Sequence, residues 1–256
     1  MRTEFAKYLK KDRFGFEDLV NIMVILRGEG GCPWDREQTH QSIRKNLIEE
    51  TYEVCEGIDR EDDAILCEEL GDLLLQVVFH SRIAEEEGAF SVEDVCTGIC
   101  KKLILRHPHI FGDVRADNSD QVLRNWDEIK KVEKNQRTAT EGLASVPRQL
   151  PALMRADKLQ KKAAKAGFNF ADQAGVKAPE ELQKTEPARQ EKEIGDLLFS
   201  GVALARKLGV DPEEALTAAS DKFLRRFAQM EKRAPGELSQ LTPEELDALW
   251  RSTEEE

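Results

Sequence analysis

The residues best suited to chemistry are acids that recur at helical spacing. Residues 49–53 read EETYE. On a helix, Glu50 and Glu53 are about 60° apart around the axis, and Glu49 and Glu53 are about 40° apart. The three carboxylates therefore project from one side of the predicted helix. A single E-x-x-E of this kind is more often a solvated face, so its setting decides what it means.

A second acidic pair follows on the next predicted helix. Glu69 and Asp72 are three residues apart, so they share one helix face. The connection between the two helices, residues 59–63, is short and charged, which predicts an antiparallel hairpin. Its midpoint falls at residue 61, which is halfway between the two acidic motifs. Both acidic pairs should then lie at the same depth and face each other.

Carboxylates that converge at one level repel each other unless a cation lies between them. Oxygen ligands without His or Cys favour Mg²⁺, with Mn²⁺ as a substitute, and Mg²⁺ completes its shell with water and substrate phosphates. Lys102 and Arg106, one helix later, could neutralise phosphate charge. The pattern predicts a magnesium–polyphosphate site at which water attacks phosphorus, helped by metal and a carboxylate base. The predicted catalytic residues and metal ligands are Glu50, Glu53, Glu69 and Asp72.

The run LLLQVVF at residues 73–79 follows Asp72 directly. We expect this helix to be apolar almost all round and therefore buried, which favours a functional reading of its acids. Glu49, Lys102 and Arg106 are assigned to substrate binding, although structural roles remain open for the two cations.

The histidines argue against a di-iron site, which needs E-x-x-H steps. Such a site takes two of these steps, and of the four histidines, His40, His80, His107 and His109, only His40 follows a glutamate (Glu37) by three residues. We expect His80 to be a packing or polar-network residue. His107 and His109 lie at a helix end, where they could cap the helix or border the substrate.

The composition predicts an all-α protein. Of 256 residues, 40% are hydrophobic and 34% are charged, and helix formers dominate. The net charge of −12 argues against nucleic-acid binding. Five cysteines without a C-x-x-C suggest neither disulfides nor zinc, and no segment resembles a signal peptide or membrane span. We therefore expect a cytoplasmic protein.

Helical periodicity continues along the chain and is interrupted by residues 138–152, a predicted linker that contains Gly and two prolines. Helices are predicted over residues 16–27, 39–58, 64–86, 91–107, 119–137, 153–166, 179–184, 190–208, 212–233 and 243–251.

The second half of the chain repeats the first. Glu93, Lys102 and Arg106 recur 120 residues later as Glu213, Lys222 and Arg226, and Asp72 recurs 124 residues later as Asp196. Each half also ends in a helix with one tryptophan, Trp126 or Trp250. This indicates two tandem helical modules, residues 1–140 and 141–256.

Five segments together resemble the MazG family of all-α nucleoside triphosphate pyrophosphohydrolases. They are CPWD (32–35), EETYE (49–53), ELGDLL (69–74), RHPHIF (106–111) and SVPRQLPALMRADKLQKKAAKAGFNF (145–170). The resemblance implies Mg²⁺-dependent cleavage of nucleoside triphosphates between the α and β phosphates. It also implies a homodimer built of helical bundles. For the second copy it implies metal ligands Glu193 and Asp196, with Lys222, Arg225, Arg226 and Trp250 near the nucleotide.

Neither copy follows the family pattern throughout. In the second, Lys184 replaces the third acid of E-E-x-x-E, and Glu181 to Glu193 spans 12 residues where Glu50 to Glu69 spans 19. In the first, Lys101 and Leu105 stand where the second has Asp221 and Arg225. Because metal ligation is indispensable and a peripheral cation is not, we predict that the first copy holds the better metal site. The alternative is a degenerate protein that binds nucleotides or partners without catalysis.

Overall fold

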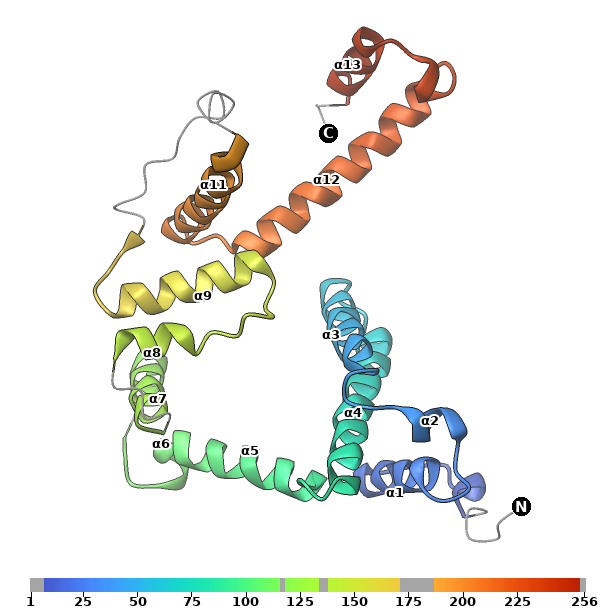
Figure 1. The fold of residues 1–256 in the computed structure, drawn as a ribbon, viewed down its shortest axis with the longest axis vertical. Helices are drawn as coiled ribbons and strands as arrows, with labels where there is room; N and C mark the ends of the chain where they lie inside the picture. The colour runs from blue at the N-terminus through green and yellow to red at the C-terminus, as the bar shows by residue number, and fades with distance from the viewer. Residues whose placement is uncertain (1–6, 116–117, 134–137, 171–186, 254–256) are drawn as a thin grey trace. The chain divides into compact units, whose positions relative to one another are not determined.

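The computed structural model describes residues 7–115, 118–133, 138–170 and 187–253, and all secondary structure in these ranges is helical (Figure 1). The predicted all-α class is confirmed. The chain divides into two compact units, Met1–Lys130 and Lys131–Glu256. The predicted module boundary at residue 140 falls inside a short helix, and the predicted helix over 179–184 lies outside the described residues.

The helices of the first unit follow the periodicity of the sequence closely. They are α1 (Phe16–Arg27), α2 (Pro33–Glu37), α3 (Arg44–Asp59), α4 (Asp63–Glu86), α5 (Val92–Arg106), α6 (Pro108–Phe111) and α7 (Ser119–Glu133), after a 3-10 turn at Tyr8–Lys10. Side chains cap the free N–H groups at three of the starts: Asp62 caps α4, a reciprocal pair, Ser91 and Asp94, caps α5, and Asn118 caps α7. The unpredicted α2 and α6 both begin with proline, which costs nothing at the first helical position.

The helices α3 and α4 pack side by side as the predicted antiparallel hairpin. Gly57 lies buried at their contact, and a Cβ there would lie 2.9 Å from the Leu66 backbone nitrogen. The missing side chain therefore lets the two helices approach closely. The turn between them passes through Glu61, whose φ of 52° is in the left-handed region.

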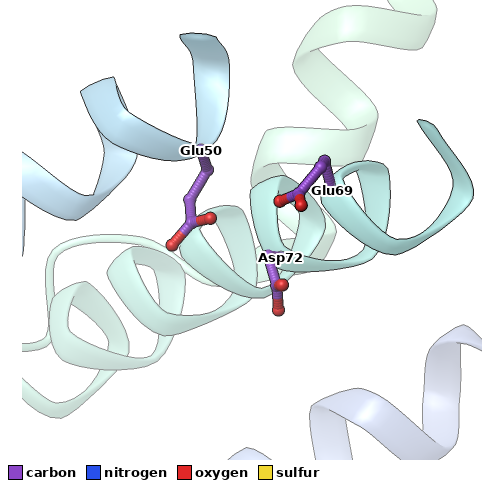
Figure 2. A group of neighbouring side chains, drawn as sticks. All are labelled: Glu50, Glu69 and Asp72. Atoms are coloured by element: carbon purple, nitrogen blue, oxygen red, sulfur yellow. The ribbon is translucent and has the colours of Figure 1, made fainter. Parts of the chain in front are cut away.

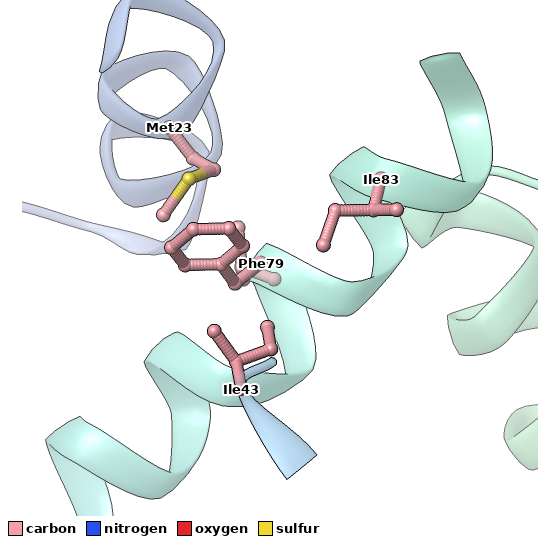
Figure 3. Close-up of a cluster of buried hydrophobic side chains, with 5 residues drawn as sticks. Met23, Ile43, Phe79 and Ile83 are labelled. Carbon is pink, nitrogen blue, oxygen red and sulfur yellow. The ribbon is translucent and has the colours of Figure 1, made fainter. Parts of the chain in front are cut away.

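A small apolar core fixes the other end of this hairpin. Met23 of α1 and Ile43, just before α3, contact Val78, Phe79 and Ile83 of α4 (Figure 3). The Arg27 guanidinium stacks over the Phe79 ring at 5.3 Å and donates to the carbonyls of Asp35 and Gln38. This arginine thereby ties α1, α2 and the segment before α3 to the core.

The expectation that α4 is buried all round is wrong for the single chain. Leu70, Leu74 and Val77 are 48%, 40% and 38% exposed. These residues lie at i, i+4 and i+7, so they form one stripe along the helix. The neighbours α1, α3 and α5 cover other sides of α4 and leave this stripe uncovered.

The second unit contains α8 (Ala139–Ala144), α9 (Ala152–Lys165), α11 (Pro187–Lys207), α12 (Pro212–Arg233) and α13 (Pro243–Arg251), with a 3-10 turn at Leu238–Gln240. Helix α9 packs against α8, α11 and α12, and α12 packs against α13. Part of the predicted linker is helical, because Thr138 and Glu141 form a reciprocal cap that starts α8. None of the helices described here is both long and apolar enough to cross a membrane.

Candidate active site

Three of the predicted ligands meet across the α3–α4 hairpin (Figure 2). Glu50 of α3 and Glu69 and Asp72 of α4 each offer one carboxylate oxygen, and these three oxygens all lie within 4.8 Å of one another. All three side chains are partly buried. Their positions follow from the helical spacing and the close packing at Gly57, which bring the two acidic faces to the same depth.

The other two acids of E-E-x-x-E lie farther out. Glu53 is exposed one turn after Glu50, and its negative charge raises the pKa of both Glu50 and Glu69. It therefore lies at the edge of the acidic group. Glu49 is also exposed on α3 and does not belong to the group of three.

The acidic group carries strong mutual repulsion. Burial raises the pKa of Glu50, and the charge of Asp72 raises it further. Desolvation likewise raises the pKa of Glu69, followed by the charges of Glu53 and Asp72. Because this group of described residues offers only oxygen ligands, it suits a hard cation such as Mg²⁺ or Mn²⁺, whose charge would relieve the repulsion.

One residue of this site, Gln76, was not predicted from the sequence. Its side-chain amide nitrogen lies 3.5 Å from Oε1 of Glu50. Gln76 is only 6% exposed, on the same face of α4 as Asp72. Its spacing of one helical turn after Asp72 was the signal that could have identified it.

The two predicted cations of α5 differ in their surroundings. Lys102 is exposed, whereas Arg106 is buried and stacks over Trp126 at 5.4 Å. The ring of His107 meets the same tryptophan edge-on at 5.1 Å, and its Nδ1 lies 2.7 Å from the Leu103 carbonyl oxygen. Arg106 and His107 are therefore both engaged in holding the end of α5.

His80 belongs to a polar pair in the first unit. Nδ1 of His80 lies 2.8 Å from Nδ1 of His40, and the rings stack with centroids 5.1 Å apart. Desolvation, followed by the neighbouring His40, lowers the pKa of His80. The pair links the segment before α3 to α4, in agreement with the predicted polar-network role.

The second unit places its predicted site residues on two helices. Glu193 is partly buried and Asp196 is exposed on α11, while the facing motif, residues 180–184, lies outside the described part of the chain. On α12, Lys222 and Arg225 are exposed. The structure thus describes only one side of the predicted second metal site.

Arg226 and Trp250 contact each other within the second unit. The guanidinium lies 3.9 Å from the centroid of the indole ring and donates to Thr253 Oγ1 and the Trp250 carbonyl at 3.2 and 3.1 Å. Arg226 thereby joins α12 to the end of α13. Beside it is a shallow groove of about 290 Å³, lined by Phe223, Phe227, Met230, Leu246, Asp247 and Trp250.

Comparison with known proteins shows to which family this chain belongs. The MazG nucleotide pyrophosphohydrolase domain matches residues 38–111, which include α3 and α4. A nucleoside triphosphate pyrophosphohydrolase/pyrophosphatase MazG of Thermotoga maritima is 45% identical over 244 residues, which cover 92% of this chain and 94% of the relative. A nucleoside triphosphate pyrophosphohydrolase of Escherichia coli K12 is 44% identical over 243 residues, 90% of this chain and 92% of the relative. The YabN protein of Bacillus subtilis is 46% identical over 94% of this chain and 52% of the relative. The chain belongs to the MazG nucleotide pyrophosphohydrolase family.

Proposed function

We propose that this chain hydrolyses nucleoside triphosphates between the α and β phosphates, releasing a nucleoside monophosphate and pyrophosphate. The observation that carries the proposal is the meeting of Glu50, Glu69 and Asp72 across the α3–α4 hairpin. The names and near full-length similarity of the relatives support the same activity. Such an enzyme would remove unwanted nucleotides from the cellular pool.

We propose Mg²⁺ as the metal, with Mn²⁺ as a substitute. When bound, it would neutralise phosphate charge and activate the attacking water. Glu50, Glu69 and Asp72 would hold it, and Glu53 adds a fourth carboxylate at the edge of the group. The close packing of α3 and α4 fixes the directions of the two acidic faces before substrate arrives.

The nucleotide-binding residues are proposed from charge and exposure. Lys102, Lys222 and Arg225 are exposed and can reach phosphate oxygens, and Glu49 is an exposed acid that directly precedes Glu50 on α3. Arg106 and Arg226 are partly or fully buried against tryptophans, so phosphate binding would require them to give up part of those contacts. The second copy's acids, Glu193 and Asp196, remain proposed metal ligands of lower importance.

We further propose that two copies of the chain form a homodimer of duplicated helical modules. The exposed stripe Leu70, Leu74 and Val77 lies on the same helix as the acidic group and supports an interface there. Sedimentation should show a particle of twice 29.0 kDa. Leu74→Glu should dissociate it, whereas Leu9→Glu, a control at another exposed leucine, should not. A wild-type monomer would contradict the interface.

The activity is tested by product identity. The protein is incubated with Mg²⁺ and each canonical or modified nucleoside triphosphate, and monophosphate and pyrophosphate are measured. Release of both, abolished by a chelator, is expected. Release of orthophosphate and a nucleoside diphosphate would place the cleavage between the β and γ phosphates. Nucleotide binding without any release would favour the alternative, a catalytically degenerate binding protein, which Lys184 in the second copy and Lys101 in the first suggest. Direct nucleic-acid binding is not expected at a net charge of −12.

A cytoplasmic location also remains a proposal. It is based on the nucleotide substrates and on the five cysteines, all of which are free.

A further inference from the structure

We propose that Gln76 is a positioning residue that holds the Glu50 carboxylate in place for metal binding. The inference rests on the proposed function of the acidic group. It adds a neutral side chain that neither the acidic motifs nor the repeat indicated.

Gln76 lies next to the proposed metal ligands, where its side chain can hold one of them in position. On α4, Glu69, Asp72 and Gln76 fall within about 60° around the helix axis, so Gln76 extends the acidic face by one turn. Its side chain is directed across the hairpin at Glu50 of α3. The amide must present its nitrogen to Glu50, because the reverse orientation would set two oxygens against each other.

The burial of Gln76 needs an explanation. Its Oε1 has no hydrogen-bond partner among the described residues, and the contact of its nitrogen with Glu50 is long. An amide that is buried and only half satisfied costs free energy, and an apolar side chain would fill the same volume without that cost. Stability alone therefore does not require a polar side chain at this position. The amide of Gln76 is nevertheless directed at the Glu50 carboxylate.

An amide is suited to this task because it is neutral. A lysine or arginine at the same place would also bind Glu50, but its charge would compete with a divalent cation for the carboxylate. Gln76 can orient one oxygen of Glu50 by hydrogen bonding and leave the full negative charge available to the metal. Groups that orient metal ligands in this way affect metal affinity.

The second copy has no equivalent. Ser200 is the residue that aligns with Gln76 when Asp196 is aligned with Asp72, and it is equally buried at 6%. Its hydroxyl donates to the Asp196 carbonyl of its own helix at 2.8 Å. It therefore bonds within α11, and it provides a matched control for Gln76.

The test is Mn²⁺ binding to the full-length protein, measured by titration calorimetry. Gln76→Met keeps the length of the side chain and removes its hydrogen bonding, and we expect it to weaken Mn²⁺ binding by about 10- to 100-fold. Ser200→Ala should bind like the wild type. Pyrophosphate release by Gln76→Met should recover to within a few-fold of the wild type at saturating Mn²⁺, which damage to the fold would not allow.

Two outcomes separate this inference from the proposed function. A wild-type protein that neither binds Mn²⁺ nor releases pyrophosphate would overturn the proposed function. If the wild type does both and Gln76→Met binds Mn²⁺ with an affinity within twofold of the wild type, the proposed role of Gln76 is overturned and the proposed function stands. If Gln76→Met fails to fold, Gln76→Asn replaces it. The amide of Asn is one methylene too short to reach Glu50, so the same weakening of Mn²⁺ binding is expected. Mn²⁺ affinity within twofold of the wild type would refute the role of Gln76.

Discussion

The sequence E-x-G-D occurs once on α4 and once on α11, and the two copies stand in different surroundings. Asp72 of α4 is partly buried beside Glu50 and Glu69, whereas Asp196 of α11 is exposed. One turn later, Gln76 reaches across to the facing helix, while Ser200 bonds to its own helix. The motif supplies only one wall of a metal site. In the first unit α3 supplies the other side through Glu50, whereas residues 180–184, the corresponding motif of the second copy, lie outside the described residues.

Each unit also contains an arginine stacked over a tryptophan, and these two pairs differ much less than the acidic motifs do. Arg106 stacks over Trp126, and Arg226 stacks over Trp250. The first pair joins the end of α5 to α7, and the second joins α12 to α13. The arginine–tryptophan pairs support the fold of each unit, and the acids carry the difference between them.

The largest expected effect separates the two E-x-G-D copies directly. Asp72→Asn should lower the turnover number by at least about 100-fold, because losing metal coordination removes several kcal/mol of transition-state stabilisation. Asp196→Asn should have a much smaller effect, less than about tenfold. Steady-state pyrophosphate release measures both. If only Asp196→Asn abolishes turnover, the active copy has been assigned to the wrong half; Glu53→Gln, expected to abolish turnover too, gives an independent check.

The next effect tests whether Arg226 serves the fold or the phosphates. Arg226→Ala should lower the stability of the second unit by about 1–2 kcal/mol, because it removes a stacking contact and two hydrogen bonds. Lys222→Ala, one turn earlier and exposed, is the matched control and should leave stability unchanged. Thermal unfolding and KM are measured for both variants. An Arg226→Ala protein with wild-type stability and a raised KM would assign that arginine to substrate.

Acid should affect the first unit more than the second, because His80 lies in the first unit and burial lowers its pKa. The pKa of His80 is lowered in the fold, so the unfolded chain takes up its proton at a higher pH, near 6.5. Stability is therefore present above pH 6.5 and falls as pH drops below it, by at most about 1.4 kcal/mol per pH unit.

Hydrogen exchange of α4 and α12 amides between pH 8 and pH 5, corrected for the intrinsic exchange rate, compares the two units. Protection in α4 should decrease with acid, and His80→Phe should remove that decrease. Equal loss of protection in α12 would contradict the role of the histidine pair.

The smallest expected effect is an increase in the stability of the metal-free protein. Burial and the neighbouring acids raise the pKa of Glu50, so its charged form destabilises the metal-free fold. Glu50→Gln should stabilise the metal-free protein by up to about 1 kcal/mol, since partial exposure screens the repulsion. The same variant should lose turnover. Thermal unfolding in the presence of a chelator measures the gain, and a lower melting temperature would show that Glu50 contributes to the fold rather than straining it.

The sequence predicted the helices and the hairpin well, because both depend on local rules. Helix α12 begins and ends as predicted, at Pro212 and Arg233, since Asp211 caps its start. The short helices α2, α6 and α8 were missed, because prolines and glycine in their segments indicate turns as readily as single helical turns. The predicted burial of α4 was wrong, because apolar periodicity does not tell which partner covers a face.

By itself, the sequence determined the all-α class, the two acidic faces and their equal depth in the hairpin, since helical spacing and a short connection leave little freedom. Only the tertiary structure decided which acids meet, leaving Glu53 at the edge and bringing Gln76 to Glu50. It also showed that Arg106 and Arg226 stack on tryptophans. The physical reason is that spacing determines the direction of a side chain from its own helix. What the side chain meets depends on how closely, and at what rotation, the next helix packs.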